Sequence, residues 1–140
     1  MSQRVDAPVD IKVRLAALWA STMFCYIYCD YFELYVPGKL DGMLRGQMGP
    51  LGAVSQGILV GTSLLMAVPS LMIALSVLLP ARLNRPVNIA VGGFYAFLLA
   101  LIAFTSAWYF YSLFAGIEAL LAALVVRLAW TWPAHRTSPA

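Results

Sequence analysis

The stretch ILVGTSLLMAVPSLMIALSVLL, residues 58–79, decides the fold of this 140-residue chain. It carries no charged residue and shows no alternation of apolar and polar positions, whereas a strand of a membrane β-barrel alternates over about 10 residues. A helix rises about 1.5 Å per residue, so about 20 apolar residues cross a hydrocarbon core about 30 Å thick. The stretch is therefore predicted to be a membrane-spanning helix.

The rest of the chain repeats this pattern. The predicted helices cover about residues 15–36, 51–79, 87–108 and 109–130. Breaker-rich segments connect them, and short connections make neighbouring helices antiparallel. Only 11% of the residues are charged and the mean hydropathy is +0.83, against about 25% charged in soluble domains. The composition excludes a water-soluble monomer and predicts one all-α transmembrane domain over residues 1–140, an integral membrane four-helix bundle.

Lysine and arginine indicate the orientation of this bundle. Lys39 and Arg45 follow the first predicted helix, and the other basic residues fall on the opposite side: Arg4, Lys12, Arg14, Arg82, Arg85, Arg127 and Arg136. Because cytoplasmic ends carry the excess of positive charge, both termini are predicted to be cytoplasmic. This asymmetry accounts for the net charge of +3, so no nucleic-acid partner is expected.

Cysteine and histidine give no sign of a metal or cofactor site. Cys25 and Cys29 lie one helical turn apart, where a disulfide would be strained, and they are expected to pack as small apolar residues. His135 is the only histidine and lies in the C-terminal tail. The sequence also contains no phosphate-binding glycine loop and no nucleophile-elbow motif. We expect neither a metal nor a cofactor.

Three acidic residues lie within the apolar stretches. A carboxylate at bilayer depth costs about 2.5–3.5 kcal/mol on insertion scales, so such residues usually face the bundle interior and serve a function. Asp30 and Glu33 share one face of the first helix with Tyr26, and Glu118 lies nearer the middle of the fourth. With both termini inside, all three acids fall in the outer half of the bilayer. We predict that Asp30, Glu33 and Glu118 are catalytic residues.

Aromatic side chains crowd the same level and complete the predicted site. The expected substrate-binding residues are Tyr26, Gln56, Trp108, Tyr111 and Phe114. Alternatives remain open: the aromatic residues are also typical of an interfacial belt, and Asp30 and Glu33 lie close enough to the helix end to reach the outer surface. For Glu118 the alternative is a protonated acid that is hydrogen-bonded to a neighbouring helix.

Two features bear on packing. Pro69 removes one backbone hydrogen bond within the second helix and should kink it, which membrane helices tolerate when a neighbour satisfies the freed carbonyl. Small residues at four-residue spacing, such as Gly57 and Gly61 or Gly92 and Ala96, predict close helix packing. Whether the Gly57 stripe packs within one subunit or between copies in a homo-oligomer is left open.

Several segments resemble a bacterial family of small four-helix membrane proteins that is a domain of unknown function. The resemblance covers about residues 11–132 and includes KVRLAALW, YIYCDYF, LRGQMG, SQGILVGTSLLMAVPSLMIALS, LNRPVNIAVG and YFYSLFAGIEALL. The matching residues are Cys29, Asp30, Gln56, Pro69, Asn84, Arg85, Asn88 and Glu118. Other members often carry a glutamate where this chain has Ala67. The resemblance implies a multi-pass protein of the bacterial plasma (inner) membrane and no particular activity.

Three classes of function fit these residues. In a membrane enzyme, Asp30 and Glu118 would serve as acid and base, with Glu33 as electrostatic partner, in the isomerisation or cyclisation of a lipid-soluble substrate held among aromatic rings. A proton-coupled transporter of hydrophobic cations would use the same acids, although its site is expected near the midplane. In a non-catalytic partner subunit, the acids would only fix the helix register. We expect the enzyme, acting on a hydrophobic small molecule within the lipid bilayer.

Overall fold

The structure is a computed structural model that describes residues 8–133, and within these residues the chain forms helices and no strand. The predicted all-α class is confirmed. The long helices are α1 (Ile11–Glu33), α3 (Gln56–Leu78), α4 (Ala81–Thr105) and α5 (Tyr109–Trp130). Arg4, His135 and Arg136 lie outside the described residues.

Three of these helices, α3, α4 and α5, are long and apolar enough to cross a membrane. Their outward faces are apolar as well: Leu64, Leu71 and Leu78, spaced seven residues apart along α3, are each more than half exposed. A contiguous apolar surface of this kind needs a partner that is not water. The chain therefore has the features of a membrane-spanning protein.

The helix bounds differ from the expected ones where glycine and proline gather. The second long helix begins at Gln56 instead of about residue 51, because residues 49–51 form the short 3₁₀ helix η1 (Gly49–Leu51) and Ser55 caps α3 by accepting the N–H of Ile58 at 3.2 Å. The third begins at Ala81 instead of about 87, since Pro80 is its N-cap residue and Pro86 is accommodated in its second turn.

The first long helix ends at Glu33 instead of about residue 36. The segment that follows it is more ordered than a simple connection. It contains the short helix α2 (Lys39–Leu44), which begins after Gly38 at φ +80°, a conformation that favours glycine. An isolated antiparallel bridge joins Gln47 to Ala53. The connection between α1 and α3 thus forms a small folded cap at one end of the molecule.

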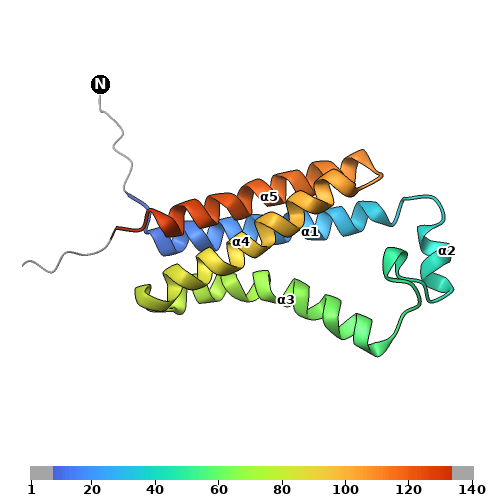
Figure 1. Ribbon diagram of the computed structural model, residues 1–140, viewed down its shortest axis with the longest axis horizontal. Coiled ribbons are helices and arrows are strands. Elements are labelled where there is room, and N and C mark those ends of the chain that lie inside the picture. Colours follow the sequence, from blue (N-terminus) through green and yellow to red (C-terminus); the bar gives the residue numbers. More distant parts are fainter. Residues whose placement is uncertain (1–7, 134–140) are drawn as a thin grey trace, which may run out of the picture.

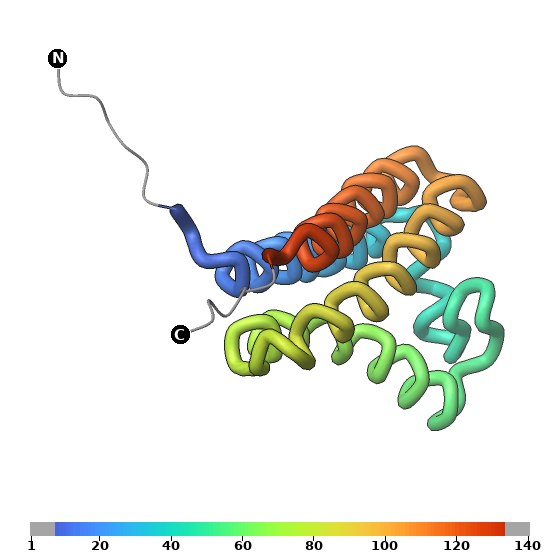
Figure 2. The backbone as a smooth tube through the Cα atoms, turned by 60° about the vertical axis from the view of Figure 1, so that its left-hand side comes forward, coloured from blue at the N-terminus to red at the C-terminus, as the bar shows by residue number. Residues whose placement is uncertain are grey.

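The long helices form a bundle that is closed at one end (Figure 1). There, α3 and α4 meet at a tight turn and then diverge as a V that opens toward α2, and the tube in Figure 2 shows the same divergence. Helix α4 packs mainly against α5, α5 also against α1, and α3 mainly against α1. The first and last described residues lie at the closed end, opposite α2.

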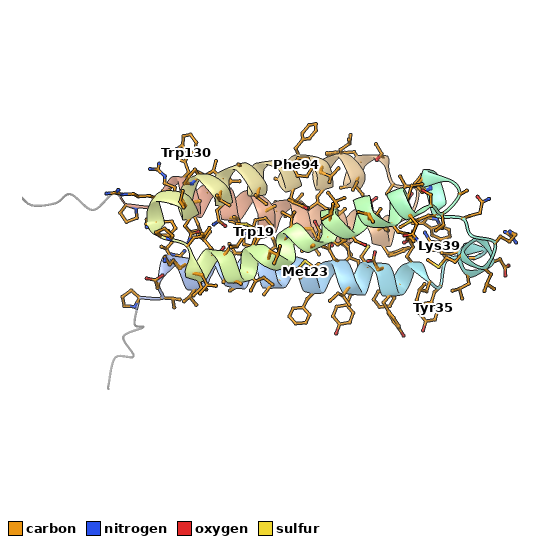
Figure 3. The ribbon with its side chains drawn as sticks, turned by 90° about the horizontal axis from the view of Figure 1, so that it is seen from below. Trp19, Met23, Tyr35, Lys39, Phe94 and Trp130 are labelled. Atoms are coloured by element: carbon orange, nitrogen blue, oxygen red, sulfur yellow. The ribbon has the colours of Figure 1, made fainter. Side chains whose placement is uncertain are left out.

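Helices α4 and α5 approach each other closely at Gly92. A Cβ atom added to Gly92 would lie 3.0 Å from Val126 Cγ2 and 3.3 Å from the backbone oxygen of Ala122. Trp19 fills the core beside this contact, with its ring edge-on to that of Tyr95 at a centroid distance of 6.1 Å. Figure 3 shows Trp19 inside the bundle and Lys39 at the α2 end. The tight packing fixes the position of α5, and with it Glu118.

Candidate functional site

A cavity of about 60 Å³ lies between α1, α3, α4 and α5. Its wall combines apolar side chains, such as Leu65 and Leu99, with six side chains that carry a hydroxyl, carboxyl or thiol group. These are Tyr26, Cys29 and Asp30 from α1, Tyr95 from α4, and Tyr111 and Glu118 from α5. The cavity therefore gathers polar chemistry from three helices inside an otherwise apolar bundle.

Glu118 is the most unusual member of this wall. Its side chain is 3% exposed, and its Oε1 atom is buried without a hydrogen-bond partner among the described residues. Buried polar atoms in folded proteins nearly always have a partner, and leaving one without costs about 1–3 kcal/mol. The sequence left open that Glu118 is hydrogen-bonded to a neighbouring helix, and Oε1 makes no such hydrogen bond to the described residues. Glu118 thus retains an unused hydrogen-bonding position at the cavity.

Four of the predicted site residues meet at this cavity. Glu118 and Tyr111 come from α5, one above the other along the same face, and Tyr26 and Asp30 come from α1, one helical turn apart. Tyr26 is buried, whereas Asp30 is exposed and lies at the rim. The structure thus brings together two carboxyl groups and two phenols from helices that are far apart in the sequence.

Two other predicted residues lie elsewhere. Glu33 does not line the cavity but forms an ion pair with Lys39 of α2, with Oε1 and Nζ 2.5 Å apart. The short cap places Lys39 next to the last residue of α1, which the spacing of the acids did not reveal. Gln56 is exposed as the first residue of α3, at the wide end of the V, where the divergence of α3 carries it away from the cavity.

Phe114 and Trp108 also lie outside the cavity wall. Phe114 stacks on Phe32 of α1 at a centroid distance of 6.3 Å. Both Phe114 and Trp108 line a separate open groove of about 360 Å³ near α2, together with Tyr35. Figure 3 shows Tyr35 at this end of the molecule. The two residues therefore belong to an aromatic cluster at the helix ends, as expected for an interfacial belt.

Tyr95 is a cavity residue that the sequence analysis missed. Its hydroxyl donates to the backbone oxygen of Leu65 at 2.5 Å. Leu65 lies four residues before Pro69, so its carbonyl is the one that the proline leaves without a helical partner. A phenol in the middle of an apolar stretch, away from the aromatic belt, was the available signal. Tyr95 ties the kink of α3 to the cavity wall.

A second polar cluster lies nearer the closed end, and in contrast to Glu118 its side chains are all hydrogen-bonded. Asn88 Oδ1 accepts from Trp19 Nε1 at 2.8 Å and from Ser76 Oγ at 3.3 Å, and its Nδ2 donates to Asn84 Oδ1 at 2.6 Å. Asn84 Nδ2 in turn donates to the backbone oxygen of Ser76 at 2.6 Å. All four side chains are fully buried. This network joins α1, α3 and α4, and none of its buried side-chain nitrogen or oxygen atoms lacks a partner within the described residues.

An open apolar groove of about 500 Å³ runs between α3 and α4 on the outer surface. Gly61, Val68 and Phe94 contribute to its wall, and Leu65 and Tyr95 line both this groove and the cavity. The shared residues place the groove directly beside the cavity, so an apolar molecule in the membrane can reach its wall.

The sulfur atoms add no metal site within residues 8–133, where no three His, Cys, Asp or Glu side chains form a possible metal-binding group. Cys25 and Cys29 are both unbridged, and Cys29 is buried. Cys29 is buried in the core, as expected of a small apolar residue, and it also lines the cavity.

Fold and site together define an all-α protein with apolar, membrane-spanning helices and a carboxyl-containing cavity between them. By sequence the chain belongs to DUF6326, a family of unknown function whose model matches residues 8–138. The expected membership in a family of unknown function is thereby confirmed. No curated protein and no solved structure matches the chain.

Proposed function

We propose that this protein is a membrane enzyme that isomerises or cyclises a lipid-soluble substrate by proton transfer. The observation that carries the proposal is the buried Glu118 carboxyl, whose Oε1 has no partner and which lines a cavity together with Asp30, Tyr26 and Tyr111. A group that only fixes the helix register is expected to be paired, as Asn84 and Asn88 are. An unpaired acid beside a cavity is instead typical of a group that meets a ligand.

The arrangement suggests a division of roles between the two acids. Burial without a partner disfavours the charged form of a carboxyl group, so Glu118 would carry the proton and donate it to a substrate double bond or epoxide. The rings of Tyr26 and Tyr111 would stabilise the resulting cation through their π faces. Asp30, exposed at the rim, would accept a proton from a neighbouring carbon. Return of that proton to Glu118 through water restores the starting state, so the reaction consumes no net proton.

The size of the cavity restricts how a substrate binds. A volume of about 60 Å³ holds only a few non-hydrogen atoms, roughly two water volumes. The reacting end would therefore lie in the cavity, and the apolar remainder would lie in the groove between α3 and α4, which shares Leu65 and Tyr95 with it. The substrate class that fits is a long hydrocarbon with one reactive end, such as an isoprenoid polyene or its epoxide.

The buried network supports the enzyme over the transporter. Transport requires the site to open alternately to both sides of the membrane. Asn84, Asn88 and Trp19 fill the bundle on the side of the closed end and are hydrogen-bonded to one another, so an opening there would break several buried hydrogen bonds. The other side has no such network among the described residues. A one-sided cavity favours chemistry on a substrate that enters and leaves by the same route.

The proposal includes a four-span topology with both termini in the bacterial cytoplasm. Helix α1 is as long as α3, at 23 residues, and its charged residues lie near its two ends, leaving residues 15–29 uncharged. Its outward face is apolar, since Phe24 and Ile27 are more than half exposed. An apolar face on the outside of a helix of this length is suited to lipid.

The test is turnover of defined substrates in heavy water. The purified protein in liposomes is incubated with squalene, geranylgeraniol and 2,3-oxidosqualene, and products are separated by chromatography and mass spectrometry. Protonation of a double bond in squalene or geranylgeraniol predicts an isomer that carries deuterium on carbon. Protonation of the epoxide in 2,3-oxidosqualene predicts a cyclised alcohol that is an isomer of the substrate, with the solvent deuteron on the exchangeable hydroxyl. Glu118→Gln should abolish it and Asp30→Asn should reduce it at least tenfold, while both variants still insert and elute as folded protein.

Glu33→Gln is the matched control, because Glu33 lies on α1 like Asp30 but outside the cavity wall. This variant should retain activity. Turnover by Glu118→Gln at the unaltered rate would remove Glu118 from the site. If no substrate reacts, and if a cationic dye instead triggers proton release from the liposomes in a Glu118-dependent way, the transporter replaces the enzyme. Inactivity in both assays would leave the partner subunit.

A further inference from the structure

A third groove, with a volume of about 620 Å³, lies between α1 and α5 near the closed end of the bundle. Arg14 in the first turns of α1 and Arg127 in the last turn of α5 both line it, with Ser21 and Thr131 as hydroxyl-bearing neighbours. The remaining wall is aliphatic and includes Leu18 and Leu124. None of these residues lines the cavity around Glu118.

The two arginines line the same groove, and neither has an acidic partner within the described part of the chain. Among residues 8–133 the one ion pair is Glu33 with Lys39, at the opposite end. Asp10, four residues before Arg14 in the sequence, caps α1 by accepting the N–H of Lys12 at 2.8 Å. Arg85, from α4, is directed at the backbone oxygen of Trp130 at 3.3 Å. The groove thus holds two like charges that an anion between them would stabilise.

The order of residues along the groove suggests which anion. Arg14 and Arg127 lie at the helix ends, at the level of a membrane interface, whereas Leu18, Ser21 and Leu124 lie farther toward the middle of the bundle. A charged mouth that continues into an aliphatic channel matches a phosphate group followed by an acyl chain. A planar guanidinium binds phosphate oxygens through two parallel hydrogen bonds, and basic pockets between membrane helices bind lipid headgroups.

We propose that the groove between α1 and α5 binds the phosphate headgroup of an anionic phospholipid, with Arg14 and Arg127 as its ligands and an acyl chain along Leu18 and Leu124. Membrane orientation depends only on the number of basic residues at this end, in whatever direction their side chains point. Their convergence on one groove is an additional feature that orientation does not require. The site is independent of the reaction proposed for Glu118.

The experiment measures lipid preference by native mass spectrometry of the purified protein in detergent, with phosphatidylglycerol and phosphatidylcholine of the same acyl chains. We expect phosphatidylglycerol to be retained about 30-fold more tightly, as for two basic contacts near an anionic headgroup. Arg14→Gln combined with Arg127→Gln should bring the ratio to within about twofold. Arg82→Gln, a change of an exposed arginine outside the groove, is the matched control and should preserve the ratio.

Single Arg14→Lys and Arg127→Lys variants keep the charge but lose the planar fork, so each should weaken the preference only in part. Inorganic phosphate and glycerol 3-phosphate separate a free anion from a lipid, and neither should displace bound phosphatidylglycerol. Equal retention of the two lipids, an undiminished ratio in the double glutamine variant, or displacement by inorganic phosphate would each overturn the proposal.

Discussion

Tyr95 and Glu118 line the same cavity, but their polar atoms are in opposite states. The Tyr95 hydroxyl donates to the backbone oxygen of Leu65, so it has a structural role in α3. Glu118 Oε1 has no partner among the described residues. The two side chains therefore differ in role. Tyr95 stabilises the cavity wall, and Glu118 keeps a hydrogen-bonding atom available for a ligand.

At the residue scale, we predict that Tyr95→Phe destabilises the protein through the Leu65 carbonyl. Hydrogen bonds between membrane helices contribute about 0.6 kcal/mol on average and at most about 1.7, so the loss should be about 1 kcal/mol. Unfolding in mixed detergent micelles, followed by circular dichroism, measures it. In a Pro69→Ala background, where residue 69 regains its N–H, the same change should cost clearly less. An equal cost in both backgrounds would show that Tyr95 does not act through the proline.

Sequence alone identified Glu118, Asp30, Tyr26 and Tyr111 as candidates, because an acid within an apolar stretch stands out and helical spacing selects its neighbours. It did not indicate that Glu33, which shares a helix face with Asp30, lies outside the cavity wall and pairs with Lys39. The reason is Lys39, whose position depends on the fold of the segment between α1 and α3. A lysine that reaches a helix end from a folded connection leaves no periodic pattern in the sequence.

The contact between α4 and α5 is the clearest interaction at the scale of whole elements. Gly92 allows the helices to approach until a Cβ atom would lie 3.0 Å from Val126 Cγ2. The adjacent Gly93 has no atom within 4 Å of such a Cβ position. Small residues thus permit close packing only on the face that meets another helix.

We predict that Gly92→Ala destabilises the protein by about 1–3 kcal/mol, as overpacking does in close-packed interiors, because Val126, Val125 and the Ala122 carbonyl, all within 3.3 Å of the added Cβ atom, must move. Gly93→Ala supplies the control on the same helix and should be neutral or slightly stabilising, since alanine favours the helix by up to about 1 kcal/mol over glycine. Thermal unfolding of the two variants in detergent compares them. Similar melting temperatures for both would contradict this description of the contact.

Pattern reasoning at this scale succeeded for apolar length and for the Gly92 stripe, left the partner of the Gly57 stripe open, and misplaced the start of α4 at a proline. Gly57 and Gly61 share the spacing of the Gly92 stripe, yet a Cβ atom on Gly61 meets nothing within 4 Å in the described chain. The spacing of small residues indicates that two helices can approach closely, but it does not indicate which face of a helix meets another helix. Pro86 likewise lies inside α4, because a proline in the second turn removes only one hydrogen bond near an end of the helix.

The whole molecule is arranged so that its two ends differ, with both described chain ends opposite the α2 cap (Figure 1). Hydropathy was sufficient to predict the all-α membrane class, since α3, α4 and α5 leave no other way to bury their surface. Helix α1 is less clear-cut by composition, because Lys12, Arg14, Asp30 and Glu33 lower its hydropathy. The number of crossings therefore depends on α1.

We predict that labelling from outside intact bacterial cells distinguishes four crossings from three. In a Cys25→Ala, Cys29→Ala background, single Asp41→Cys and Ala107→Cys changes should react with a membrane-impermeant maleimide before the cells are permeabilised. Val9→Cys and Arg82→Cys should react only afterwards. Reaction of Val9→Cys on the same side as Asp41→Cys would mean that α1 does not cross the membrane.

The end of α3 that adjoins α4 is anchored from both sides. Lys12 Nζ donates to the backbone oxygens of Val77 and Leu79 at 3.2 and 2.7 Å, and Asn84 Nδ2 donates to that of Ser76. Beyond this anchorage α3 packs mainly against α1 and makes few contacts with α4. About halfway along, the hydroxyl of Tyr95 on α4 holds it at the backbone oxygen of Leu65. Separation of α3 from α4 beside the cavity would therefore have to break this hydrogen bond, which makes Tyr95 the latch between the apolar groove and the space around Glu118.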